Sequence, residues 1–117
     1  MSEESIDVKE VLERVQDDKE LLLELFDIFQ QDYAEKRRNL NDFIARKDFE
    51  QIKALAHSLK GASGNISAKK LNVLFVKLEQ LGKSNDLTNI NPFLKDLDEQ
   101  YGLVQAHIVQ LKKDFKK

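Results

Sequence analysis

The segment with the sequence Ala-His-Ser-Leu-Lys-Gly-Ala-Ser-Gly-Asn, residues 56–65, contains the side chains best suited to do chemistry in this chain. If the segment is a helix, with about 100° between successive residues, its apolar side chains fall within one arc and His57 points away from them. The residues expected to surround His57 on that outer face are Lys53, Ala54, Lys60, Gly61 and Gly64. The spacing therefore predicts a water-exposed histidine beside cations and beside positions with little or no side chain. We expect Gly61, Gly64, Lys53 and Ala54 to form a docking surface around it.

These residue types suit the transient transfer of a phosphoryl group. At cellular pH an exposed imidazole keeps a neutral, nucleophilic ring nitrogen. Lys60, one helical turn later, is placed to neutralise phosphoryl oxygens. Each glycine inside a helix lowers helix stability by about 1 kcal/mol relative to alanine. The presence of two glycines, Gly61 and Gly64, beside the same histidine therefore calls for an explanation. We expect that their missing side chains allow a second protein to approach the ring, although glycines at a helix end would look the same.

The remaining sequence predicts the helices that position this segment, beginning with two helices near the N-terminus. Asp7 and Glu10 have the spacing of a capping box, and valine and leucine residues of one face follow, so a short first helix is expected. Asp17 and Glu20 repeat that spacing. They precede a long apolar stripe of helical period, which predicts a second helix that ends near residue 45.

Capping signals also bound the helix that carries His57 and the helix after it. Asp48 and Gln51 form a third box after an expected turn at residues 46–47. Ser67 is predicted to cap a fourth helix, and Gly82 to end it before a polar loop.

The dipeptide Asn91-Pro92 predicts the start of a last helix, because proline favours the first helical position, and apolar residues spaced by threes and fours continue to Phe115. No segment alternates as a strand does. We therefore predict an all-α fold, an antiparallel up-down four-helix bundle with a short extra N-terminal helix, as one domain over residues 1–117.

The segment around His57 resembles the motif of the histidine-containing phosphotransfer (HPt) family of two-component phosphorelays. That motif reads approximately His-x-Leu-Lys-Gly-x-Ser/Ala-Gly-Asn-Ile/Leu-Gly. The residues that match it here are His57, Leu59, Lys60, Gly61, Ser63, Gly64, Asn65 and Ile66. Two positions depart from the family, because Ser67 replaces a usual glycine and Lys47 replaces a common turn glycine. The helix pattern of essentially the whole chain is also similar to the family.

The resemblance implies a role for each of these residues. His57 would carry the phosphoryl group on Nε2, Lys60 would stabilise it, and Gly61 with Gly64 would keep the docking face flat. Glu79, on the following helix, is expected near His57. The resemblance further implies no kinase or nucleotide site in this chain and no cofactor of its own. The expected partners are response-regulator receiver domains, which supply Mg²⁺, or a hybrid sensor histidine kinase.

Composition excludes several other classes. A net charge of -2 leaves no broad basic surface for nucleic acid, and the absence of cysteine excludes thiolate metal sites. A di-iron bundle needs Glu-x-x-His pairs, but Ala54 and Val104 stand three residues before His57 and His107. No metal site is expected. A membrane span needs about 20 apolar residues, and no apolar run approaches that length, so we expect a cytoplasmic protein. We also expect a monomer, because a partner must be able to reach His57.

Two other interpretations stay open from the sequence. The same bundle could serve as a non-catalytic protein-interaction module that binds through a helical face, although the retained His57 argues against it. The chain could also be the phosphotransfer domain of a larger sensor kinase, with the same chemistry. His107 lacks lysine and glycine neighbours and is interpreted as an ordinary helix side chain.

Overall fold

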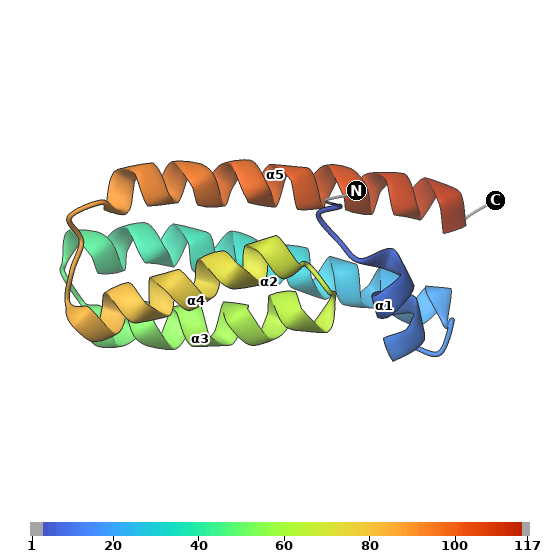
Figure 1. The fold of residues 1–117 in the computed structure, drawn as a ribbon, viewed down its shortest axis with the longest axis horizontal. Helices are drawn as coiled ribbons and strands as arrows, with labels where there is room; N and C mark the ends of the chain where they lie inside the picture. The colour runs from blue at the N-terminus through green and yellow to red at the C-terminus, as the bar shows by residue number, and fades with distance from the viewer. Residues whose placement is uncertain (1–3, 116–117) are drawn as a thin grey trace.

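The described part of the chain folds into four long antiparallel helices and a short one. The computed structural model describes residues 4–115, and all regular structure in that range is helical. The helices are α1 (Val8–Arg14), α2 (Lys19–Ala45), α3 (Phe49–Asn65), α4 (Lys69–Ser84) and α5 (Ile90–Phe115). Figure 1 shows α2 to α5 running alternately along the long axis, with α1 across one end. The predicted up-down four-helix bundle with a short extra N-terminal helix is thereby confirmed.

The N-cap residues predicted for α2 and α4 are wrong. The N-cap of α2 is Asp18, whose carboxylate accepts a hydrogen bond from the backbone N–H of Leu21 at 3.0 Å. Asp17 instead lies in the preceding turn with a φ of 61°. Ser67 does not cap α4, because α4 begins one residue later than expected, after Ala68, which makes no side-chain cap. The hydroxyl of Ser67 donates to a carboxylate of α1 at 2.8 Å.

The boundaries between α4 and α5 also differ from the prediction. Gly82 does not end α4, which continues to Ser84 and is followed by Asn85 in the left-handed conformation, with a φ of 54°. Gly82 is a buried residue inside the helix. Helix α5 begins at Ile90, so Pro92 stands in its first turn and not at its first position. Pro92 is tolerated there because the first N–H groups of a helix have no intrahelical partner.

The two positions that depart from the HPt motif share one backbone conformation. Lys47 has a φ of 54° and Ser67 a φ of 57°, so both lie in the left-handed region that favours glycine. Each follows a helix whose last carbonyl groups it helps to satisfy, because the N–H of Lys47 donates to Ile44 and that of Ser67 to Gly64. The glycines usual in the family at these positions have a structural explanation that the sequence alone did not suggest.

The bundle core is built from the inward side of every helix. Phe26 of α2 and Phe75 of α4 are fully buried in it, with leucine, isoleucine and valine around them. Tyr33 and Tyr101 stack at 3.7 Å between ring centroids and so join α2 to α5. No helix within residues 4–115 is long and apolar enough to cross a membrane.

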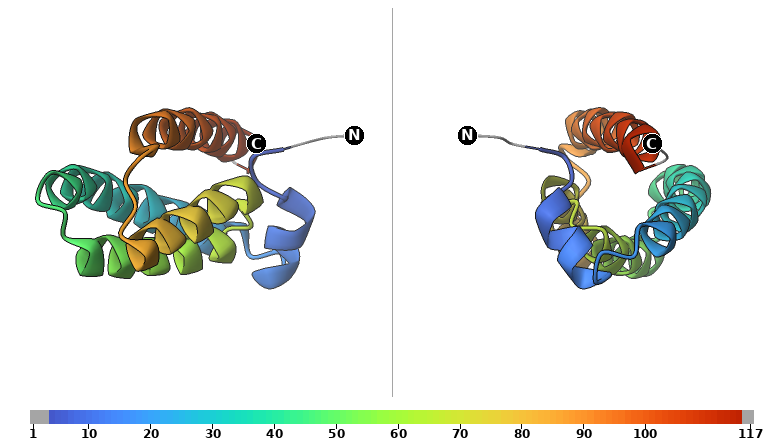
Figure 2. Two further views of the ribbon diagram at one scale, coloured as in Figure 1. Left: turned by 60° about the vertical axis from the view of Figure 1, so that its left-hand side comes forward. Right: turned by 90° about the vertical axis from the view of Figure 1, so that its right-hand side faces the viewer.

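Helices α3 and α4 are the most closely packed pair, and α5 contacts the others more loosely. Both views in Figure 2 show α3 and α4 side by side, with α5 set apart on the other side of the bundle. Because α3 and α4 have this close contact, side chains on their outer edges can reach one another. The segment that carries His57 lies on this pair.

Candidate functional site

His57 lies on the exposed outer face of α3, as its spacing predicts. Its side chain is 70% exposed, while its neighbours Ala56 and Leu59 are buried in the core. The N-cap that starts this helix is Asp48, whose carboxylate accepts from the backbone N–H of Gln51 at 3.2 Å, so the predicted start is confirmed. Helical periodicity from this fixed start sets the outward direction of the imidazole.

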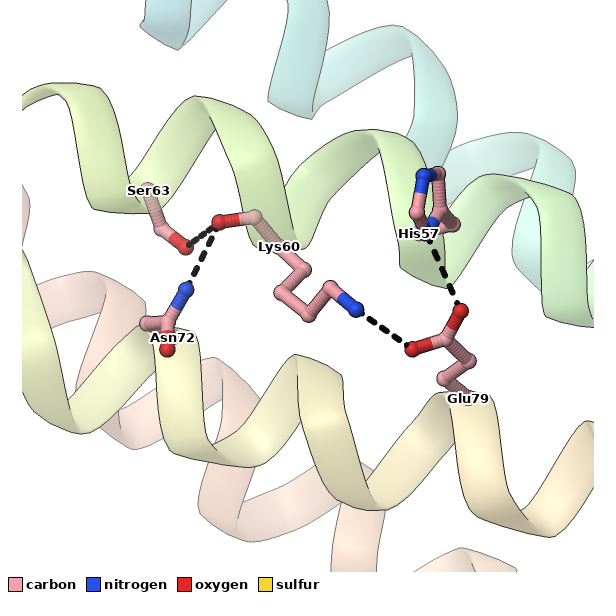
Figure 3. Close-up of polar contacts among 5 residues, drawn as sticks. All are labelled: His57, Lys60, Ser63, Asn72 and Glu79. Carbon is pink, nitrogen blue, oxygen red and sulfur yellow. Dashed lines mark hydrogen bonds and ion pairs between the residues drawn. The ribbon is translucent and has the colours of Figure 1, made fainter.

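The carboxylate of Glu79 links His57 to Lys60. One of its oxygens, Oε2, lies 3.1 Å from Nδ1 of His57, and the other, Oε1, accepts from Nζ of Lys60 at 2.8 Å. Figure 3 shows Glu79 reaching from α4 toward both side chains of α3. Glu79 is largely buried, with a side chain 10% exposed. The resemblance to the HPt family placed Glu79 near His57, and the structure brings the two together.

This arrangement fixes which nitrogen of His57 carries a proton. The pKa of Glu79 is lowered, chiefly by the hydrogen bond from Lys60 and also by the one from His57. Desolvation acts in the opposite direction but is outweighed. An ionised carboxylate only accepts hydrogen bonds, so the contact with Nδ1 requires a proton on that nitrogen. The neutral ring then presents its lone pair at Nε2. A carboxylate partner of this kind also fixes the orientation of the ring.

A second contact between α3 and α4 supports Lys60 from its backbone side. The carbonyl oxygen of Lys60 accepts from Nδ2 of Asn72 at 2.7 Å and from the hydroxyl of Ser63 at 3.0 Å. Figure 3 shows Asn72 on α4 and Ser63 on α3 meeting at this oxygen. Neither contact was predicted from the sequence. Ser63 is part of the matched motif, but nothing in the sequence indicated that Asn72 crosses to the other helix.

The glycines and small residues predicted around His57 divide into two groups. Gly61 and Ala54 are exposed, and a methyl group at Gly61 would meet nothing within 4 Å. Gly64 is half-buried, and a Cβ there would lie 3.6 Å from Nδ2 of Asn72. Because α3 continues to Asn65, Gly61 does not mark the helix end, whereas Gly64 lies within its last turn.

Lys53 contributes less to the exposed face than its position suggested. It is half-buried, its ammonium lies 3.5 Å from the carboxylate of Glu50, and its backbone contacts Gly82 of α4. His107 is remote in sequence and belongs to a different cluster, because its Nδ1 lies 3.1 Å from the hydroxyl of Ser5. In residues 4–115 no three His, Cys, Asp or Glu side chains are grouped so that they could hold a metal ion.

Comparison with known proteins identifies the class to which this site belongs. The family model of the Hpt domain matches residues 24–111, which include both helices of the site. The chain therefore belongs to the Hpt domain family, the histidine phosphotransfer carriers of phosphorelays.

A solved structure with the same fold is the histidine-containing phosphotransfer protein B (HptB) from Pseudomonas aeruginosa PAO1. The two chains superimpose with a TM-score of 0.87, over 97% of this chain and 98% of HptB, at 21% sequence identity. At that identity the likeness shows the fold. A search of curated proteins gave no significant match.

Proposed function

We propose that His57 accepts a phosphoryl group from the phospho-aspartate of a receiver domain and passes it to an aspartate of another receiver domain. The observation that carries this proposal is the contact of 3.1 Å between Nδ1 of His57 and Glu79, which leaves the nucleophilic lone pair on Nε2. The membership in the Hpt domain family supports the same role.

In the accepting step, Nε2 of His57 attacks the phosphorus atom of the aspartyl phosphate. The bond between phosphorus and Nε2 forms while the bond between phosphorus and the aspartate oxygen breaks, and the electron pair leaves with the aspartate carboxylate. The proton on Nδ1 stays, so the ring becomes a cation that Glu79 stabilises through the existing contact. Transfer onward is the reverse reaction, with a different aspartate oxygen as the nucleophile.

This chain contributes position and a nucleophile, and the partner contributes the rest of the transition-state stabilisation. The receiver domain would supply an acidic pocket with Mg²⁺, which would neutralise charge on the phosphoryl oxygens. No nucleotide takes part in such an exchange, so the chain acts as a carrier and not as a kinase.

Lys60 serves the phosphorylated state. In the unphosphorylated protein its ammonium is paired with Glu79 at 2.8 Å, so the two charges balance before transfer. A phosphoryl group on Nε2 adds negative charge one helical turn from Lys60, whose ammonium already shares the Glu79 carboxylate with His57. We propose that the ammonium then turns from Glu79 toward the phosphoryl oxygens, while Glu79 keeps its contact with His57.

The receiver domain would dock over α2 and α3. A groove between these helices is lined mainly by apolar side chains that include Leu25, Ile28 and Ala62, the residue after Gly61. Ile28 is 62% exposed, so the apolar lining of the groove extends to the surface that a partner would cover. We propose that a receiver covers Gly61, Gly64 and this groove together. A monomer in the cytoplasm leaves that face accessible to receivers, or to a hybrid sensor histidine kinase.

A phosphotransfer assay tests the proposal. A receiver domain loaded with phosphate is mixed with the protein and Mg²⁺, and the product is examined for acid-labile, base-stable phosphate. We expect label that maps to His57, is removed by a second receiver and is absent from His57→Gln. A folded protein that takes no label from any of several receivers would contradict the proposal. It would favour the alternative, a helical interaction module without chemistry.

A further inference from the structure

We infer that Gly82 is a positioning residue for His57, which acts by setting the distance between α4 and α3 at the site. The inference rests on the proposed function, because it assigns a role in orienting the phosphoryl-accepting ring. Gly82 is buried in α4, and a Cβ at this position would lie 2.9 Å from the backbone nitrogen of Lys53 and 3.1 Å from its Cα. These are backbone atoms of α3, which no side-chain rotation can move away.

The contact between Gly82 and Lys53 lies beside the contact between Glu79 and His57. Glu79 is three residues before Gly82 on α4, and His57 is four residues after Lys53 on α3. Residues three and four apart are neighbours on the same helix face. Because the two helices run antiparallel, the two contacts are one turn apart, about 5 Å along the axes. The distance between the helices at Gly82 therefore determines how far Glu79 must reach.

A second fixed point lies on the other side of Glu79. Nδ2 of Asn72 donates to the carbonyl oxygen of Lys60 at 2.7 Å, about two turns before Glu79 on α4. The carboxylate is thus held between a hydrogen bond at Asn72 and a backbone contact at Gly82. With both points fixed, α4 has little freedom to move closer to His57 or to move away from it.

The hydrogen bond between Glu79 and His57 is sensitive to a change in the distance between α3 and α4. Nitrogen–oxygen hydrogen bonds span about 2.7–3.2 Å, and the distance from Nδ1 to Oε2 is already 3.1 Å. A methyl group at Gly82 reaches ordinary contact with Lys53 only when the 2.9 Å separation grows to at least 3.4 Å. A comparable displacement at Glu79, one turn away, exceeds the range of the hydrogen bond.

The test replaces Gly82 by alanine and uses Gly102 as its matched control. Gly102 is exposed in the middle of α5, and a Cβ there would meet nothing within 4 Å, so Gly102→Ala adds the same methyl group without displacing a helix. Gly82→Ala is made in the Gly102→Ala background, because alanine in an exposed helix raises stability and helps the double variant to remain folded. Circular dichroism establishes that it is folded.

Two NMR measurements on the unphosphorylated protein give the result. The ¹⁵N shifts of the imidazole report the population with a proton on Nδ1, and the ¹³C titration of the Glu79 carboxyl reports its pKa. We expect Gly82→Ala to lower the Nδ1-protonated population and to move the pKa of Glu79 up toward its ordinary value. Gly102→Ala alone leaves both unchanged. Unchanged values in the folded double variant would overturn the inference.

Glu79→Asp gives an independent answer that does not require a change at Gly82. Aspartate is one methylene shorter, so its carboxylate regains Nδ1 only if α4 moves toward α3. Since the backbone of Lys53 would lie only 2.9 Å from a Cβ at Gly82, α4 has little room to approach α3. We therefore expect Glu79→Asp to lose the Nδ1-protonated population as fully as Glu79→Ala. Retention of that population by aspartate would overturn the inference, even if the double variant does not fold. Neither measurement uses a receiver, so failure of phosphotransfer and failure of this inference are distinguishable.

Discussion

Replacing Gly61 by alanine should stabilise the protein and slow phosphotransfer at the same time. Gly61 is an exposed residue inside α3, and a Cβ there would meet nothing within 4 Å. Glycine in a helix interior is about 0.5–1 kcal/mol less favourable than alanine, so Gly61→Ala should raise the free energy of unfolding by that amount. For a chain of this length the gain corresponds to about 2–6 °C in Tm.

The same methyl group should weaken the encounter with a receiver domain. If the partner surface packs directly on the α3 backbone at Gly61, an added carbon overpacks that contact, which costs about 1–3 kcal/mol. Since 1.4 kcal/mol is about a factor of ten, transfer at limiting receiver concentration should slow by about 5- to 150-fold. Gly61→Gln, which is uncharged and larger, should slow transfer further while it remains more helix-favouring than glycine.

Gly102 supplies the control for both effects. Gly102→Ala and Gly102→Gln make the same changes at an exposed helical glycine with no neighbour within 4 Å, in the middle of α5. Stability is measured by thermal and urea unfolding, and transfer by the initial rate of label uptake at several receiver concentrations. We expect equal stability gains at both positions and slower transfer only at Gly61. Full transfer by Gly61→Gln would refute the docking role of this glycine.

Three further predictions concern stability. Phe75→Ala should cost about 3–5 kcal/mol in urea unfolding, because Phe75 is 0% exposed in the core. Lys47→Gly should raise stability by up to about 1 kcal/mol in the same assay, because it relieves a left-handed backbone at a φ of 54°. The pKa of Asp7 is lowered chiefly by the backbone N–H of Glu10, and that of Glu10 chiefly by Lys69. Their stabilisation is present above the ordinary values of 3.8 and 4.5 and is lost as pH falls through the lowered ones, so the urea midpoint should decrease below about pH 4.5.

The part of the site that lies on one helix was predictable from the sequence. Helical period alone places His57 on the outer face and Lys60 one turn later, because the start of α3 is fixed by the Asp48 cap. The part that lies across two helices was not. Glu79 was expected only through the resemblance to the HPt family, and Asn72 was not anticipated, because its contact exists only once α4 packs against α3.

The two wrongly predicted helix caps, Asp17 and Ser67, have a common cause. Capping preferences identify residue types, and two adjacent candidates such as Asp17 and Asp18 satisfy them equally. The choice depends on which residue adopts the left-handed turn conformation, and in this chain Asp17 does. Ser67 likewise fits a cap by type, but its positive φ makes it the residue that closes α3. A left-handed backbone conformation at a non-glycine residue is difficult to predict from the sequence.

Three glycines lie in helix interiors, and only their surroundings distinguish their roles. Gly61, Gly82 and Gly102 carry a similar intrinsic cost, since helix propensity depends on the residue type. At Gly82 the cost is offset by backbone contact with α3, since any side chain there would meet Lys53 at 2.9 Å. At Gly61 no described residue lies close enough to offset it, and Gly61 is one helical turn from His57, the proposed nucleophile. A glycine that destabilises its helix, contacts no other helix and lies beside the proposed phosphoryl acceptor is best explained by a contact that forms only when a partner is bound.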